Sequence, residues 1–115
     1  MKVIIAGGRD FNDYDFLKSK VDKILSMRDN IEIVSGVANG ADKLGELYAI
    51  EYNHKIKRFP ADWGRFNRQA GYIRNIEMAD YADALIVFWD GKSKGTKHMI
   101  DVAEEKNLLI RIIMY

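Results

Sequence analysis

Short apolar runs alternate along the chain with segments in which apolar residues recur every three or four positions. The apolar runs have the length of β-strands and cover residues 3–6, 31–34, 55–59, 84–89 and 108–114. Four helices are expected between them: one capped by Asn12 or Asp13 and ended by residues 29–30, one starting near Gly40, one from Arg65 to Tyr81, and one from about Gly95 to Asn107. The pattern predicts an α/β fold.

Strands that alternate with helices form parallel sheets covered by helices on both faces. The run at 55–59 is shorter and more polar than the others, so we expect it near a sheet edge. A chain of 115 residues is too short for two separate cores, and we therefore expect a single domain spanning residues 1–115.

Composition narrows the classes of function. The net charge of +1 argues against a global basic field for duplex DNA or a membrane surface, and the chain has no cysteine for a disulfide, thiol catalysis or a thiolate metal site. The apolar run near the N-terminus is too short for a membrane span, so a cytoplasmic protein without a membrane partner is expected.

Three glycine-containing loops follow predicted strands, at residues 7–10, 35–42 and 90–96. The C-terminal ends of parallel strands lie at one edge of the sheet, where such folds bind ligands. The last loop leads into a helix start, and the backbone N–H groups and the helix dipole there favour an anion. Lys92, Ser93, Lys94 and Thr96 add charge and hydroxyl donors. The alternative is that each loop is only a turn.

Two common nucleotide motifs are missing from these loops. The first loop is not a GxGxxG fingerprint, and Ser35 stands where an NAD site would have a ribose-binding acid. The second loop lacks the Lys-Ser/Thr pair of a P-loop. Asp42 and Glu46 are four residues apart on one helical face, where they either offset the helix dipole or accept hydrogen bonds from a ribose or base. Trp63 and Trp89 either stack on a base or pack in the core.

The ordered set of motifs resembles one known family. Gly-Gly-Arg-Asp-Phe at 7–11, Ser-Gly-x-Ala-x-Gly-Ala-Asp at 35–42, Glu46, Pro-Ala-Asp-Trp at 60–63, Ala-Gly-x-x-Arg-Asn-x-x-Met at 70–78 and Ser-x-Gly-Thr at 93–96 are similar to the YspA-like branch of the SLOG superfamily. This superfamily also holds the DprA/Smf DNA-processing proteins and the LOG-type phosphoribohydrolases. The resemblance implies a Rossmann-like three-layer sandwich, a mainly parallel five-stranded sheet of order resembling 3-2-1-4-5, and a site for a nucleotide-derived ligand.

The LOG-type enzymes cleave the N-glycosidic bond of nucleoside monophosphates. Arg74 resembles the arginine of their signature, but Asn75 follows it where those enzymes usually have a second basic residue. His98-Met99 stands where their key acid is expected, and a histidine cannot stabilise an oxocarbenium-like ribose as a carboxylate does. The resemblance therefore favours nucleotide binding by a sensor or regulatory module over a phosphoribohydrolase, with DprA-like single-stranded nucleic-acid binding as a further alternative.

Each candidate residue has an expected role. Arg9 and Arg74 are expected to pair with phosphate charge, and Arg74, Glu46 and Asp42 are the catalytic candidates if turnover occurs. The expected ligand-binding residues are Gly7, Gly8, Arg9, Asp10, Ser35, Gly36, Gly40, Ala41, Asn75, Asp90, Gly91, Ser93, Gly95 and Thr96. The sequence has no metal motif, and Mg²⁺ held by the bound phosphate is the one cofactor considered. The expected partner is a small nucleotide-derived molecule, with a homodimer as the expected assembly and nucleic acid as the weaker expectation.

Overall fold

The computed structural model describes residues 1–115 and contains five strands and five α-helices. In chain order the elements are β1 (Lys2–Gly7), α1 (Tyr14–Leu25), β2 (Glu32–Ser35), α2 (Ala41–Glu51), β3 (Lys55–Arg58), α3 (Trp63–Phe66), the 3₁₀ turn η1 (Asn67–Gln69), α4 (Ala70–Tyr81), β4 (Ala84–Trp89), α5 (Lys94–Glu105) and β5 (Leu109–Met114). The strands form one sheet in the order β3-β2-β1-β4-β5, and every neighbouring pair is parallel. The predicted fold class and strand order are confirmed.

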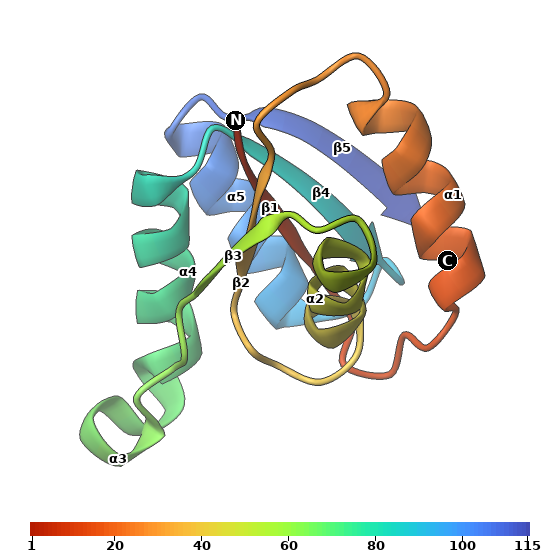
Figure 1. Ribbon diagram of the computed structural model, residues 1–115. Helices are drawn as coiled ribbons and strands as arrows, with labels where there is room; N and C mark the ends of the chain where they lie inside the picture. Colours follow the sequence, from red (N-terminus) through yellow and green to blue (C-terminus); the bar gives the residue numbers. More distant parts are fainter.

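The sheet is covered on both faces, as Figure 1 shows. Alternate residues of a strand point to opposite faces, so Val3 and Ile5 of β1 join the core under α1 and α2, whereas Ile4 and Ala6 join the core under α4 and α5. The central strands β1 and β4 are buried almost throughout, which explains their continuous apolar runs. As expected from its polar sequence, β3 is an edge strand.

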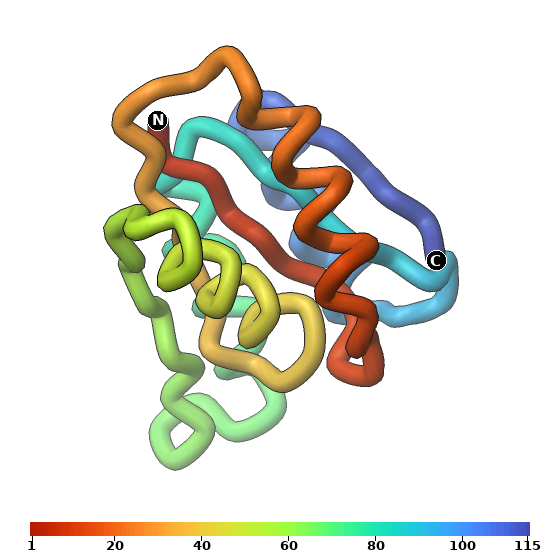
Figure 2. The backbone as a smooth tube through the Cα atoms, turned by 45° about the vertical axis from the view of Figure 1, so that its right-hand side comes forward, coloured from red at the N-terminus to blue at the C-terminus, as the bar shows by residue number.

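The predicted helix over 65–81 is wrong in one respect. The segment is divided into α3, η1 and α4, and the break falls at Asn67, whose φ of 51° lies in the left-handed region. Asparagine tolerates this conformation better than other residues with a side chain. Asp62 caps α3 by accepting a hydrogen bond from the Arg65 N–H. In Figures 1 and 2, α3 stands apart from the sheet, beyond the start of α4.

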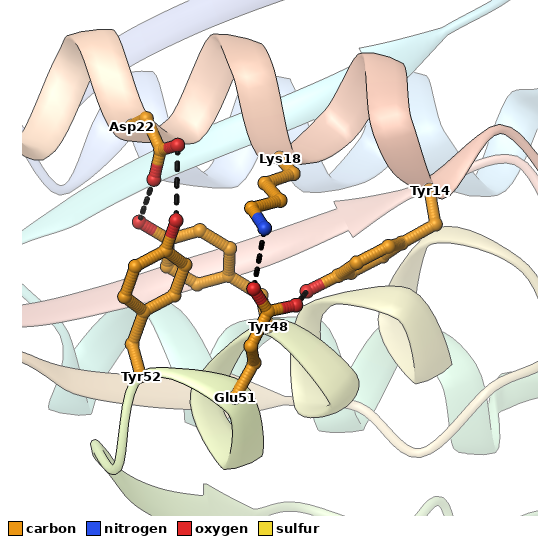
Figure 3. A network of polar contacts seen from close by, with 6 residues as sticks. All are labelled: Tyr14, Lys18, Asp22, Tyr48, Glu51 and Tyr52. Atoms are coloured by element: carbon orange, nitrogen blue, oxygen red, sulfur yellow. Dashed lines mark hydrogen bonds and ion pairs between the residues drawn. The ribbon is translucent and has the colours of Figure 1, made fainter.

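A polar network joins α1 to α2 on one face of the molecule (Figure 3). Glu51 accepts hydrogen bonds from the Tyr14 hydroxyl at 2.7 Å and from Lys18 at 2.5 Å. Asp22 accepts the hydroxyl hydrogens of Tyr48 at 2.9 Å and of Tyr52 at 3.0 Å. This network fixes the two helices side by side over the same core.

None of the helices combines the length and the apolar character that crossing a lipid bilayer requires.

Candidate functional site

A cleft of about 480 Å³ opens at the C-terminal ends of β1 and β4. The chain proceeds from β1 to β2 on one side of β1 and crosses from β3 to β4 on the other, so this is the point where strand order reverses. Ligands of open α/β sheets bind at such points. The volume lies within the range of small-molecule sites.

The cleft gathers most of the predicted ligand-binding residues, although they come from four separate segments. It is lined by Gly7, Gly8, Arg9, Asp10, Asp42, Arg74, Asn75, Asp90, Ser93, Gly95 and Thr96. Gly36 lines an adjoining hollow. Ser35, Gly40, Ala41, Glu46 and Gly91 line neither. The ligand roles of all these residues, inside and outside the cleft, stay predictions.

Eight further lining residues were not among the predicted site residues, and the large or charged side chains among them are Trp63, Arg68 and Tyr72, beside two methionines. Trp63 had two open interpretations in the sequence, and Arg68 and Tyr72 fall within the predicted helix from Arg65 to Tyr81, where the sequence singled out neither. The helix break at Asn67 brings this part of the chain to the cleft, and the sequence signal for it is weak.

Arg74 is the central charge of the cleft. It extends from α4 and is only 8% exposed. Its Nη1 donates to the Gly36 carbonyl at 2.5 Å, and its Nε donates to Asn75 Oδ1 at 3.1 Å. Burial lowers the pKa of Arg74, and the neighbouring Asp42 partly offsets that effect. Two hydrogen bonds and a carboxylate thus hold a buried guanidinium in place.

Gly36 makes this arrangement possible because it has no side chain. A Cβ at this position would lie 2.7 Å from Arg74 Nη1 and 2.7 Å from Asp42 Oδ2. Any other residue would push the two charged groups apart. Gly36, predicted as a ligand-binding residue, thus also leaves room for two charged side chains of the protein itself.

Asp42 lies at the start of α2 and faces Arg74. Burial raises the pKa of its carboxyl to about 6, against opposing contributions from Arg74 and from the Ala38 N–H that donates to Oδ2 at 3.2 Å. A carboxyl with this pKa exchanges its proton near neutral pH, which suits a general acid or base.

Glu46 lies one turn further along α2 and has a different environment. Ser35 Oγ donates to its Oε2 at 2.6 Å, and Arg58 Nε lies 2.9 Å from its Oε1. Both oxygens therefore connect α2 to β2 and β3. Glu46 does not line the cleft, and its catalytic role stays a prediction.

The loop after β4 is organised by Asp90. Its Oδ1 accepts from the N–H groups of Lys92 at 2.8 Å and Ser93 at 2.9 Å, and these bonds lower the pKa of Asp90. Ser93 then caps α5 by accepting from the Thr96 N–H at 3.3 Å. Several N–H groups expected to hold phosphate thus have internal acceptors, which leaves the first turn of α5 at Lys94 and Gly95 as the remaining donor surface.

A contact between Asn75 and His98 connects α4 to α5. Asn75 Nδ2 lies 3.2 Å from His98 Nδ1 and 3.4 Å from the Gly95 carbonyl. Burial lowers the pKa of His98 and thereby favours its neutral imidazole. The His98 ring packs on Tyr72 at a centroid distance of 4.4 Å. The structure brings no group of three or more His, Asp or Glu side chains together as a metal site.

Residues 1–66 match the family described as "YspA, cpYpsA-related SLOG family". Over 114 residues, the chain is 29% identical to the "Gene 61 protein" of Mycobacterium phage D29, covering 93% of this chain and 91% of the phage protein.

Two solved structures have the same fold. DNA processing protein A of Streptococcus pneumoniae matches with a TM-score of 0.76 at 18% identity, over 96% of this chain and 49% of that protein. DNA processing protein A of Helicobacter pylori, whose structure is described in terms of its single-stranded DNA binding mode, matches with a TM-score of 0.71 at 19% identity. That match covers 97% of this chain and 64% of that protein, so this chain spans about half to two thirds of these larger proteins. The family match extends over more than half of the sequence, and this chain belongs to the YspA, cpYpsA-related SLOG family.

Proposed function

We propose that this protein binds a nucleotide or a nucleotide-derived ligand in the cleft at the C-terminal ends of β1 and β4. The convergence of three arginines carries this proposal: Arg9 follows β1, Arg68 lies in η1 and Arg74 lies in α4, yet all three line the same cleft. Guanidinium groups bind phosphate oxygens in pairs of hydrogen bonds. The first turn of the twelve-residue helix α5 adds its N–H groups and dipole on the opposite wall.

The function proposed is binding by a sensor or regulatory module, without turnover. Glycosidic cleavage of the phosphoribohydrolase type needs a carboxylate beside the developing charge on the ribose. Asp90 already accepts two backbone N–H groups, Glu46 is held by Ser35 and Arg58, and Asp42 faces Arg74. Burial also disfavours the anionic form of Asp42, so the engagement of Asp90 and Glu46 and the raised pKa of Asp42 together favour binding over hydrolysis.

Thermal unfolding against a panel of nucleotides tests the proposal. A ligand at 100 times its dissociation constant adds about 2.7 kcal/mol to the free energy of unfolding and raises the melting temperature. Arg68→Ala is expected to weaken binding about tenfold or more, because it removes a charged hydrogen-bond donor from the cleft. The matched control is Arg65→Ala, which removes another exposed arginine that does not line the cleft.

Equal affinity of both arginine variants, or a melting temperature unaffected by every nucleotide, would contradict the proposal. Base released during incubation of the bound complex would instead establish turnover.

A second candidate function is single-stranded DNA binding, which a specific observation favours. The Helicobacter pylori protein with the same fold is described by its single-stranded DNA binding mode. The exposed aromatic rings of Trp63 and Tyr72 beside the arginines are the combination that single-strand sites use.

A further inference from the structure

The two tryptophans of this chain have different environments. Trp89, at the end of β4, packs against the core under α4 and α5, and its Nε1 donates to the Ser93 carbonyl at 3.1 Å. Trp63, at the start of α3, belongs to neither core and is not among the side chains that pack against them. It is 48% exposed. Packing therefore explains Trp89 but not Trp63.

Trp63 is nevertheless held in a defined position. The guanidinium of Arg9 lies over its ring at 5.7 Å from the centroid. Its ring also reaches Gly71, where a Cβ would lie 3.4 Å from Cη2. The Asp62 cap and the left-handed Asn67 set the short helix that carries it. A large exposed ring is thus oriented by a cation and by a glycine of α4.

Trp63 also lies where two hollows meet. The cleft described above and a second hollow of about 270 Å³ share four lining residues, Arg9, Ala38, Trp63 and Arg74. The second hollow continues to the 36–39 loop and to Pro60 and Ala61. The cleft is therefore one part of a longer groove, and Trp63 and the two arginines are at its midpoint.

We propose that Trp63 is the platform on which a nucleobase stacks, and that the groove accepts a ligand of at least two nucleotide units. This inference rests on the proposed function and extends it. One unit occupies the cleft beside the start of α5, and the next occupies the second hollow. Arg9 and Arg74, which line both hollows, contact the phosphate between them. Stacking on an aromatic face is open to every base, so Trp63 confers affinity for bases without sequence preference.

Calorimetry on the full chain tests this with thymidine 5′-monophosphate and 5′-phosphorylated oligothymidylates of two, four and eight units. The two-unit ligand is expected to bind more tightly than the monophosphate. Trp63→Ala is expected to weaken two-unit binding about tenfold or more, and Trp63→Phe is expected to keep most of the affinity. Phe66→Ala is the matched control, because Phe66 is on the same short helix and does not line the cleft.

Trp63 also provides a direct optical readout. In a Trp89→Phe background it is the only tryptophan, and a base stacked on it is expected to quench its fluorescence. A plateau at two units identifies a dinucleotide ligand, and affinity that keeps rising with length identifies a single strand. Both results support the proposal.

Several results would overturn it. If the monophosphate and the two-unit ligand bind equally well and Trp63→Ala changes neither affinity, the stacking role is wrong while nucleotide binding stands. If Trp63→Ala leaves affinity unchanged but turns a dimer into a monomer in sedimentation, Trp63 is a subunit contact. If no ligand of any length binds, the proposed function itself fails.

Discussion

At the scale of single residues, the cleft is built around charged groups that are buried within the protein. Arg74 and Asp42 are both almost inaccessible to water, and burial disfavours the charged form of each. Gly36 leaves the space in which they face each other. Burying charges lowers the stability of the folded protein. Proteins keep such buried charges where a preorganised site needs them.

The raised pKa of Asp42 predicts a specific pH dependence. Its carboxyl has a pKa of about 6 in the folded protein, whereas its ordinary value is 3.8. Between these two pH values the folded protein therefore binds more protons than the unfolded chain. The contribution of Asp42 to the free energy of unfolding therefore falls as pH rises through this window, by about 3 kcal/mol in total. The stability of wild type minus that of Asp42→Asn should decrease by up to this amount between pH 4 and pH 7.5, measured by urea unfolding.

Asp90→Asn is the control for this measurement. The pKa of Asp90 is lowered in the folded protein. Its contribution to the free energy of unfolding is therefore lost only as the pH falls below the ordinary pKa of an aspartate. The difference between wild type and Asp90→Asn should stay nearly constant over most of the same interval. A constant difference for Asp42→Asn as well would show that Asp42 is not protonated near pH 6.

At the scale of elements, the position of α2 is set at both of its ends. At its start, Ala41 N–H donates to the carbonyl of Gly8 at 3.1 Å, so the loop after β1 closes directly on α2. Along its outer side, the network of Figure 3 attaches α2 to α1. The loop that carries Arg9 into the cleft is therefore placed by the packing of a helix distant from it in sequence.

The network makes a testable contribution to stability. Asp22→Ala removes the acceptor of the buried Tyr48 hydroxyl, and an unsatisfied buried donor costs about 1–3 kcal/mol. Lys18→Met, which breaks an exposed ion pair of the same network, is expected to cost much less. Denaturant unfolding measures both changes. Ligand affinity should be unchanged in both variants, because neither residue lines the cleft. Equal losses of stability in the two variants would contradict the conclusion that the Tyr48–Asp22 hydrogen bond contributes most to the network.

At the scale of the whole molecule, positive and negative charges are nearly balanced, both over the chain and within the cleft. The net charge is +1, and Arg9, Arg68 and Arg74 share one cleft with Asp10, Asp42 and Asp90. Such a surface suits a ligand with few phosphates better than a long duplex. The homodimer expected from the sequence stays a prediction.

The number of cleft arginines limits the salt dependence of single-strand binding. About three phosphate contacts give a slope near −2 in a plot of log affinity against log salt concentration. Affinity for an oligothymidylate should therefore fall about 20-fold at most between 50 mM and 200 mM salt. Fluorescence titration at several salt concentrations measures the slope. A loss of a thousandfold would show that the strand also contacts lysines outside the cleft.

The sequence by itself determined the strands, the order of elements and the edge of the sheet at which the cleft opens. Apolar runs such as 84–89 have the length of a buried strand, and their alternation with helical segments favours a parallel sheet. The motifs of residues 7–11 and 35–42 identify the family. Local chemistry is sufficient for such features, because cap residues like Asp13 and Ser93 act on neighbours three positions away.

Only the tertiary structure decided which of the predicted residues share a cleft. Asp42 and Glu46 are equivalent in sequence, but one helical turn takes Asp42 to Arg74 and Glu46 to Ser35 and Arg58. Trp63 and Trp89 likewise have the same two interpretations in the sequence. In the structure Trp63 is exposed on the short helix that ends at Asn67, whereas Trp89 at the end of β4 packs against the core. The physical reason is that burial, and with it pKa and access to a ligand, depends on contacts between segments that are far apart in the chain.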